Sequence, residues 1–195
     1  MLVLVRHGRT AWNREVRLIG RTDLPLDEVG RAEARHVAAS LGPVAELVTS
    51  PLRRARETAA LLSTGVAARV DEAFAELDYG ETEGQPVAAV DPALWQAVRR
   101  DPATRFPGGE SLADVQRRVE AACAALVAAD GHGARREDGD CVVVSHVGPI
   151  KAAVAWALGA DASLTMRLRL STGSVTTIEW RDGAPVLSAY NVVPR

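Results

Sequence analysis

Three short and largely apolar runs, each followed by polar or charged residues, constrain the fold of this chain most strongly. The runs are Leu2–Val5, Leu47–Thr49 and Cys141–Ser145. The first stops at Arg6 and His7, and the last stops at His146. A short run without polar alternation is typical of a strand that is buried on both faces, as strands of parallel sheets are. The chain is therefore predicted to build a parallel sheet.

Stretches with helical spacing separate the predicted strands. Asp27 is placed to cap a helix that reaches about Leu41, and Ser50 with Pro51 can open a second helix that reaches about Ser63. Further helices are expected at 111–129 and 148–158, a third strand at 69–70, and two or three strands at 166–190 around a turn at 181–183. Strands that alternate with helices predict a three-layer α/β/α sandwich whose mostly parallel sheet has an antiparallel edge.

Length and composition fit a packed domain. With 195 residues and 47% hydrophobic content, the chain is expected to form one domain over residues 1–195, and disorder is excluded. Asp91-Pro92, Asp101-Pro102 and Pro107-Gly108-Gly109 break the pattern between about 85 and 109, and we expect this segment to be a lid. The polar stretch 131–140 is expected to be a loop.

The charge balance argues against several classes of partner. Lys and Arg total 23 against 25 Asp and Glu, so the net charge of -2 provides no basic field for nucleic acid or an anionic membrane. No apolar stretch approaches the ~20 residues of a membrane span, and no export signal is recognised. Cys123 and Cys141 form neither a disulfide framework nor a metal quartet and are expected to be core thiols. We expect a cytoplasmic protein with a small-molecule partner, and its assembly is left open between monomer and homodimer.

Side chains that can carry chemistry follow the ends of the predicted strands. Arg6 and His7 follow the first strand, residues 50–54 follow the second, and His146 follows the fourth. Glu76 lies in the loop after the third. Ligands of open α/β sheets bind beyond the carboxyl ends of the strands, where helix N-termini also converge. Two histidines, two arginines and a carboxylate are therefore expected to share one crevice.

This combination of residues suits a phosphoryl group. Arg54 is expected about one turn inside its helix, with its side chain leaning back toward the crevice. Two guanidinium groups and two helix N-termini match a dianion, whose oxygens accept paired N–H bonds. Glu76 among these cations makes sense as a proton donor, and the nearby Asp78, Glu81 and Glu83 are the alternatives for that role.

Several blocks occur in a recognisable order between residues 2 and 151. They are Leu4-Val5-Arg6-His7-Gly8-Arg9-Thr10 with Trp12-Asn13, Gly20-Arg21-Thr22-Asp23-Leu24-Pro25-Leu26, Ser50-Pro51-Leu52-Arg53-Arg54-Ala55, Glu76-Leu77-Asp78-Tyr79-Gly80, Pro107-Gly108-Gly109-Glu110-Ser111 and Val144-Ser145-His146. Together they closely resemble the histidine phosphatase superfamily, which is also called phosphoglycerate mutase-like. Because the blocks span most of the chain, the resemblance is specific, whereas Arg-His-Gly alone would be weak.

The resemblance implies a role for each site residue. His7 would be the nucleophile that takes the phosphoryl group as phosphohistidine, while Arg6, Arg54 and His146 hold its oxygens. Glu76 would protonate the leaving alkoxide and then activate water. The implied substrate contacts are Gly8, Asn13, Arg21 and Val147, and no metal or cofactor is implied. Because the attacking nitrogen must be unprotonated and Glu76 protonated, we expect a bell-shaped pH profile with a neutral to acidic optimum.

The chain departs from the family pattern at three positions. Many family phosphatases have Gln where this chain has Ile19, Arg where it has Ala75, and Trp where it has Thr82. The segment 145–151 looks most like acid phosphatase domains of actinobacterial type. Family mutases carry a longer segment over the site than 85–109 provides, so a hydrolase of small phosphomonoesters is favoured. A phosphoglycerate mutase and a catalytically weak module that binds phosphorylated ligands are the alternatives.

Seven further arginines surround the predicted crevice. They are Arg9, Arg14, Arg17, Arg21, Arg99, Arg100 and Arg105. Either they are solvated surface charges, or several face the pocket and bind a second anionic group of the substrate. Arg21 is the preferred candidate among them. The other two histidines, His36 and His132, are expected to be surface or packing residues.

Overall fold

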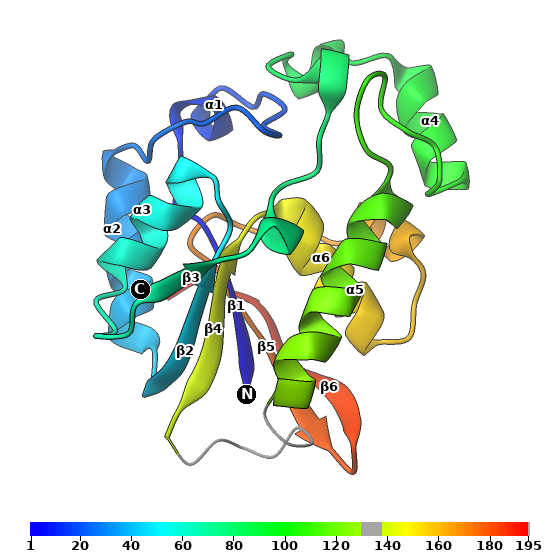
Figure 1. Ribbon diagram of the computed structural model, residues 1–195. Helices are drawn as coiled ribbons and strands as arrows, with labels where there is room; N and C mark the ends of the chain where they lie inside the picture. The colour runs from blue at the N-terminus through cyan, green and yellow to red at the C-terminus, as the bar shows by residue number, and fades with distance from the viewer. Residues whose placement is uncertain (130–137, 195) are drawn as a thin grey trace.

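The computed structural model describes residues 1–129 and 138–194 (Figure 1). The strands are β1 (Leu2–Arg6), β2 (Val44–Thr49), β3 (Ala68–Val70), β4 (Asp140–Ser145), β5 (Val175–Arg181) and β6 (Ala184–Val192). The α-helices are α1 (Ala11–Arg14), α2 (Glu28–Ser40), α3 (Arg53–Leu61), α4 (Pro92–Arg100), α5 (Leu112–Ala129) and α6 (Val147–Ala157). The 3-10 helices are η1 (Glu72–Phe74), η2 (Gly80–Thr82), η3 (Val87–Ala89) and η4 (Ala162–Arg167).

The strands form one six-stranded sheet in the order β3-β2-β4-β1-β5-β6. The neighbours β3, β2, β4 and β1 are parallel, whereas β5 pairs antiparallel with β1 and β6 antiparallel with β5. This confirms the predicted mostly parallel sheet with an antiparallel edge. The β1–β4 register pairs Arg6 with Ser145, so the residues that follow the two strands, His7 and His146, emerge beside one another.

Helices cover both faces of the sheet, with α2 and α3 on one side and α5 and α6 on the other (Figure 1). Alternate residues of β1 supply the two faces, because successive side chains of a strand point in opposite directions. Val3 and Val5 belong to the cluster that contains Val37 of α2, and Leu2 and Leu4 to the cluster formed with α5 and α6. The three-layer α/β/α sandwich is therefore confirmed.

Two helix starts show how local sequence acts. The Asp27 carboxylate accepts from the Gly30 N–H at 2.8 Å, so Asp27 caps α2 as predicted. The predicted start of α3 at Ser50 and Pro51 is wrong, because the N-cap is Leu52 and it makes no side-chain cap bond. The Ser50 hydroxyl instead lies 2.7 Å from His146 Nε2, so a tertiary contact replaces the capping role.

The tail contains a hairpin of β5 and β6. Asp182 and Gly183 connect the strands with φ angles of 52° and 79°, the left-handed pair that a tight two-residue hairpin turn requires. The expectation of strand from residue 166 onward is too broad. Residues 162–167 form η4, and the first strand of the tail begins at Val175.

Residues 85–109 contain η3 and α4, with the Asp91 carboxylate capping α4. Phe106 is buried and forms edge-to-face contacts with Tyr79 and Trp95, whose ring centroids lie 4.9 and 5.6 Å away. Helix α4 lies beyond the carboxyl ends of the parallel strands (Figure 1). Movement of this segment as a lid stays a prediction.

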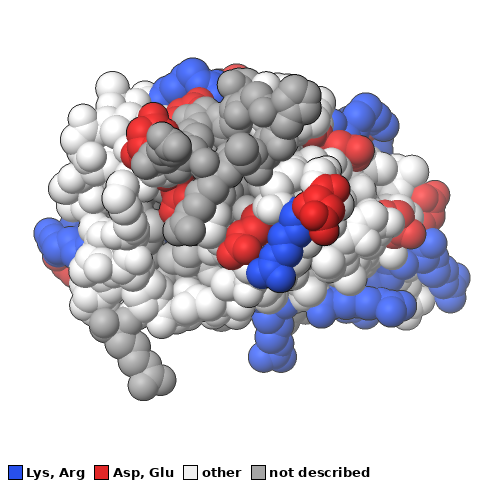
Figure 2. All heavy atoms as spheres, turned by 90° about the horizontal axis from the view of Figure 1, so that it is seen from below, with Lys and Arg blue, Asp and Glu red and all other residues white. Residues whose placement is uncertain are grey.

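On the face opposite α4, basic and acidic residues lie side by side rather than in separate patches (Figure 2). Within residues 1–129 and 138–194, no helix is both long and apolar enough to cross a bilayer. Most of the polar stretch 131–140, including His132, lies outside the described residues, whereas His36 is exposed on α2 as expected.

Candidate active site

His7 follows β1 and is 2% exposed. Its Nδ1 lies 2.7 Å from the Gly8 carbonyl oxygen, which can only accept, so Nδ1 carries the proton. Its Nε2 accepts from Arg54 Nε–H at 3.2 Å. Burial and the positive charges of Arg54 and Arg6 lower the pKa of His7 well below 6.5. Nε2 is thus unprotonated at neutral pH, and its single lone pair accepts from Arg54.

Arg54 is the second residue of α3 and is fully buried. Its two terminal nitrogens donate to the carbonyls of Thr22 at 2.9 Å and Gly20 at 2.8 Å. Burial lowers the pKa of Arg54 to about 10, and the nearby Glu76 opposes that shift. The guanidinium therefore stays charged at neutral pH and presents its Nε–H to His7.

Arg6, the last residue of β1, donates from Nη1 to the Leu170 carbonyl at 2.6 Å. Burial lowers its pKa, while Glu76 and Glu33 act in the opposite direction. Its Nε is buried and has no hydrogen-bond partner among the described residues. A buried donor of this kind is costly unless it is paired, which is consistent with an anionic ligand.

His146 follows β4 and is the N-cap residue of α6. Its ring centroid lies 5.0 Å from that of His7, and its Nε2 lies 2.7 Å from Ser50 Oγ. Nδ1 is buried and unpartnered within the described part of the chain. Burial, Arg54 and His7 lower the pKa of His146 well below 6.5. The ring is therefore neutral at neutral pH, and a charged His146 requires the opposing pull of a bound dianion.

Glu76 is 4% exposed and lies against the N-terminus of α6. Its Oε1 accepts from the backbone N–H groups of Leu77 at 2.8 Å and Gly148 at 2.9 Å. Its Oε2 accepts from Val147 N–H at 3.1 Å, which leaves this oxygen a second lone pair for a substrate. A Cβ atom at Gly148 would lie 2.5 Å from Oε1, so glycine is needed there to admit the carboxylate.

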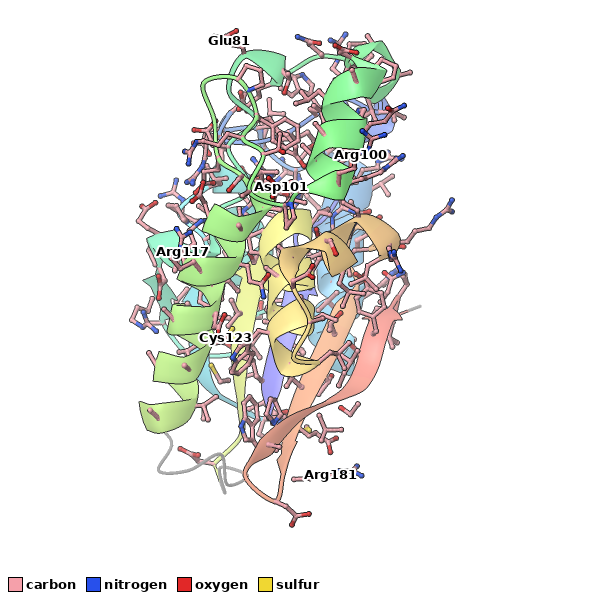
Figure 3. All side chains as sticks on the ribbon, turned by 90° about the vertical axis from the view of Figure 1, so that its right-hand side faces the viewer. Glu81, Arg100, Asp101, Arg117, Cys123 and Arg181 are labelled. Atoms are coloured by element: carbon pink, nitrogen blue, oxygen red, sulfur yellow. The ribbon has the colours of Figure 1, made fainter. Side chains whose placement is uncertain are left out.

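The alternative carboxylates occupy other positions. Asp78 accepts from Gly80 N–H, and Glu83 accepts from the N–H groups of Arg21 and Thr22. Glu81 is exposed and lies at the periphery of the molecule (Figure 3). The structure therefore favours Glu76 as the carboxylate of the crevice.

The predicted substrate contacts have varied surroundings. Gly8 donates its N–H to Thr58 Oγ1 at 3.1 Å, and a Cβ atom on it would collide with the Gly30 carbonyl, so this glycine permits close packing against α2. The Asn13 carbonyl accepts from Thr10 in a capping box, which leaves the NH₂ group as its available donor. The Val147 N–H is bonded to Glu76.

Most of the extra arginines have local carboxylate partners. Arg9 pairs with Asp27, Arg14 and Arg17 pair with Glu15, and Arg105 pairs with Asp114. Arg99 and Arg100 are exposed, and Arg100 lies on α4 (Figure 3). These six arginines support the interpretation that the extra arginines are surface charges. Arg21 differs, because it reaches Glu110 at 3.3 Å while its Nε is buried without a partner in the described residues.

Sequence reasoning missed the residues that support the site. Arg118 of α5 donates to the carbonyls of Ala73 at 2.6 Å and Glu76 at 3.3 Å, and it pairs with Glu110 at 3.0 Å. Glu110 also accepts from the Asp78 N–H. Arg118 thus holds the backbone that carries Glu76, and nothing in its helical spacing indicated this role.

The departures at Ile19, Ala75 and Thr82 are all buried. Their side chains therefore belong to the interior around the site rather than to its solvent-exposed rim. Across residues 1–129 and 138–194, no three His, Cys, Asp or Glu side chains are grouped as a metal-ligand set.

Comparison with known proteins places this arrangement in a family. The sequence profile described as histidine phosphatase superfamily (branch 1) matches residues 2–193. A bifunctional protein of Mycobacterium tuberculosis is 35% identical over 199 residues, covering 97% of this chain but 53% of that protein. The chain thus spans about half the length of this relative. The probable phosphoglycerate mutase GpmB of Salmonella paratyphi B is 32% identical, covering 97% of this chain and 89% of that protein.

Solved structures agree with the sequence relatives. A mycobacterial glucosyl-3-phosphoglycerate phosphatase in complex with VO3 superposes with a TM-score of 0.88 and 33% identity, covering 98% of each chain. Phosphoserine phosphatase of Entamoeba histolytica in complex with 3-phosphoglyceric acid superposes with a TM-score of 0.87 and 26% identity, covering 97% of this chain and 95% of that one. Because the family profile matches residues 2–193, this chain belongs to the histidine phosphatase superfamily, branch 1.

Proposed function

We propose that this protein hydrolyses phosphomonoesters of small metabolites through a phosphohistidine on His7, without a metal ion. One observation carries the proposal. The buried His7 ring has its proton on Nδ1, bound to the Gly8 carbonyl, and its Nε2 faces the Arg54 Nε–H at 3.2 Å. This arrangement holds an imidazole lone pair beside a cation that can bind the group to be attacked.

The surrounding donors fit the charge of a phosphoryl group. Arg6 Nε and His146 Nδ1 are buried and unpartnered in the described residues, and Arg54 supplies a fixed positive charge. Phosphoryl transfer depends mainly on positioning and on stabilising the charge of the equatorial oxygens. Two guanidinium groups with His146 supply that stabilisation in the proposed mechanism.

The first half-reaction forms the phosphoenzyme. The His7 Nε2 lone pair forms a bond to phosphorus as the bond from phosphorus to the ester oxygen breaks. Glu76 in its acid form gives its proton to that oxygen, so the product leaves with a hydroxyl group rather than an alkoxide. The lowered pKa of His7 keeps its nitrogen unprotonated for this attack.

The second half-reaction returns the enzyme to its starting state. The Glu76 carboxylate accepts a proton from water as the water oxygen forms a bond to phosphorus. The bond from phosphorus to His7 Nε2 breaks, and inorganic phosphate leaves. The buried position of Glu76, held by Val147 and Gly148, keeps the carboxylate close to both reactions.

A mutase is the second candidate, and its support is the 32% identity to a probable phosphoglycerate mutase over 89% of that protein. The two activities differ in their products, since a mutase accumulates an isomeric phosphoglycerate and a hydrolase releases inorganic phosphate. The protein as a pure binding module is disfavoured, because binding a phosphate does not require a nucleophile paired with a buried carboxylate. We also propose a cytoplasmic location, which the buried thiols Cys123 and Cys141 support.

Rapid quench with a ³²P-labelled substrate tests the proposal. We expect acid-labile label on the wild-type protein and none on His7→Ala, together with release of inorganic phosphate in the presence of EDTA. Turnover retained by His7→Ala would refute the assignment, and accumulation of an isomer without phosphate release would favour the mutase.

A further inference from the structure

Lys151 is the single lysine among the 23 Lys and Arg residues of the sequence. The two residue types differ physically, because an ammonium is a compact charge on a flexible stem whereas a guanidinium is a planar fork. A lone lysine in an arginine-rich chain is conspicuous when it lies beside a candidate active site, as Lys151 does.

Lys151 is the fifth residue of α6, one turn after Val147 and Gly148, whose N–H groups bind Glu76. Residues three or four apart share a helix face, and helical side chains lean toward the N-terminus. The lysine stem therefore runs back over the turn that holds the Glu76 carboxylate. Glu76 and Arg6 are the two charged groups that act on the Lys151 ammonium.

Lys151 is half-buried, yet no described residue forms a hydrogen bond or ion pair with its ammonium. The other cations of the site are anchored, with Arg6 on the Leu170 carbonyl and Arg54 on those of Gly20 and Thr22. Burial and Arg6 lower the pKa of Lys151, while Glu76 raises it. A half-buried ammonium with no direct partner has its donors free to bind an anionic group of a ligand.

The position of Glu76 tells which part of a substrate would meet Lys151. This step rests on the proposed function, in which Glu76 protonates the leaving oxygen, so the alcohol portion lies on the Glu76 side. The charges of Arg6 and Arg54 match the phosphoryl dianion, which leaves Lys151 unmatched. Two other carboxylates act on these arginines, Glu33 on Arg6 and Glu83 on Arg54. Both are already engaged, because Glu33 accepts from Arg9 N–H at 2.8 Å and Glu83 from Arg21 N–H at 3.0 Å.

We propose that Lys151 is a specificity-determining residue that binds a second anionic group, a carboxylate or a second phosphate, on the alcohol portion of the substrate. The preferred substrates are then phosphorylated hydroxy acids or bisphosphates rather than phosphomonoesters whose alcohol portion carries no anionic group. The site selects them because a neutral leaving group leaves the half-buried ammonium unpaired.

The test compares substrates that differ by one anionic group. O-phosphoserine and phosphoethanolamine differ by a carboxylate, fructose 1,6-bisphosphate and fructose 1-phosphate differ by a phosphate, and p-nitrophenyl phosphate carries no second anion. A hydrogen bond to a charged group contributes about 1.5–3 kcal/mol. Lys151→Met should therefore lower kcat/KM by about 10- to 100-fold for the preferred substrate, which carries the second anionic group. The member of each pair that lacks the second anionic group, and p-nitrophenyl phosphate, should lose much less. Any influence of the ammonium on Glu76 acts on every ester alike and cancels in the ratio of kcat/KM values within a pair.

Two further variants serve as controls. Arg181→Met removes an exposed cation from the tip of the β5–β6 hairpin, at the opposite end of the molecule from Arg100, and should leave every ratio unchanged (Figure 3). Lys151→Arg keeps the charge and should keep most of the preference. The wild-type preference should also weaken as ionic strength rises.

An equal loss on both members of each pair, or no loss on any, would overturn the role of Lys151. Failure of the proposed function is distinguishable, because wild-type protein would then hydrolyse none of the esters. In that event calorimetry on His7→Ala measures binding of O-phosphoserine and phosphoethanolamine with and without Lys151→Met. A binding preference that disappears with Lys151→Met supports the inference, and an unchanged or absent preference overturns it.

Discussion

Substitution of Gly148 by alanine tests whether the position of Glu76 matters for chemistry. A methyl group there would lie 2.5 Å from Glu76 Oε1, and an ordinary contact begins near 3.4 Å. The carboxylate must therefore retreat by about 0.9 Å, since the obstacle is the end of a flexible side chain. That movement weakens the hydrogen bonds from Gly148 and Val147 to the carboxylate.

The expected effects on stability and activity differ in size. Weakened bonds to a charged acceptor cost roughly 1–3 kcal/mol, and alanine in a helix returns up to ~1 kcal/mol. Urea unfolding should therefore show a net loss of roughly 0–3 kcal/mol. A catalytic group misplaced by ~1 Å can lose about 100-fold in rate. That loss should appear with an alkyl phosphate, whose leaving oxygen needs a proton, and nearly vanish with 2,4-dinitrophenyl phosphate, whose leaving group does not.

The matched control is Gly42→Ala, because a Cβ atom at Gly42 meets nothing within 4 Å. Steady-state kcat/KM on the two esters is compared for wild type, Gly148→Ala and Gly42→Ala, because this ratio reports phosphoenzyme formation and excludes the later hydrolysis step, in which Glu76 acts on both esters alike. Equal slowing of both esters by Gly148→Ala would refute the proton-donor reasoning, and unchanged kinetics would refute the geometric argument.

Three further predictions follow from the burial and contacts of the site. The pKa values of His7 and His146 lie well below 6.5 when folded, so the unfolded chain binds more protons than the folded one below that pH. The free energy of unfolding in urea should therefore fall as pH drops from 7 to 5, and it should fall less steeply in His146→Gln. An equally steep fall in the variant would contradict a buried, neutral His146 ring. Arg54→Lys removes the planar guanidinium that donates to Gly20, Thr22 and His7. In a phosphate-release assay kcat/KM should drop at least ~100-fold. Near-normal activity would show that the positive charge alone suffices. Gly8→Ala forces a Cβ atom against the Gly30 carbonyl and should destabilise the fold by ~1–3 kcal/mol in thermal unfolding. An unchanged melting temperature would contradict the close packing of Gly8 against α2.

Local sequence signals predicted the elements well wherever neighbouring residues carry the information. The apolar runs at β1, β2 and β4 and the Asp27 cap are properties of a few consecutive residues, and the structure confirms them. The predicted start of α3 was wrong because it depends on a contact with a distant residue. The Ser50 hydroxyl bonds with His146, a residue 96 positions away, and capping preferences contain no information about such a contact.

The arginine-rich segments likewise separate what the local sequence predicts from what only the fold decides. Their sequence allowed both surface charge and substrate binding, and the choice depended on which carboxylates fold beside them. Arg9 meets Asp27 and Arg105 meets Asp114, so their charges are matched locally. The support that Arg118 gives to the backbone of Glu76, and the unmatched position of Lys151, were likewise invisible without the fold.

By itself the sequence determined that strands of a parallel sheet end in histidine, arginine and serine, and that these residue types suit a phosphoryl group. Only the tertiary structure decided that β1 and β4 are adjacent in a register that brings the rings of His7 and His146 to 5.0 Å. It also decided which nitrogen of His7 is unprotonated and which cations lack a partner. The physical reason is that periodicity and capping act between near neighbours, whereas burial and charge pairing depend on contacts between segments far apart in the chain.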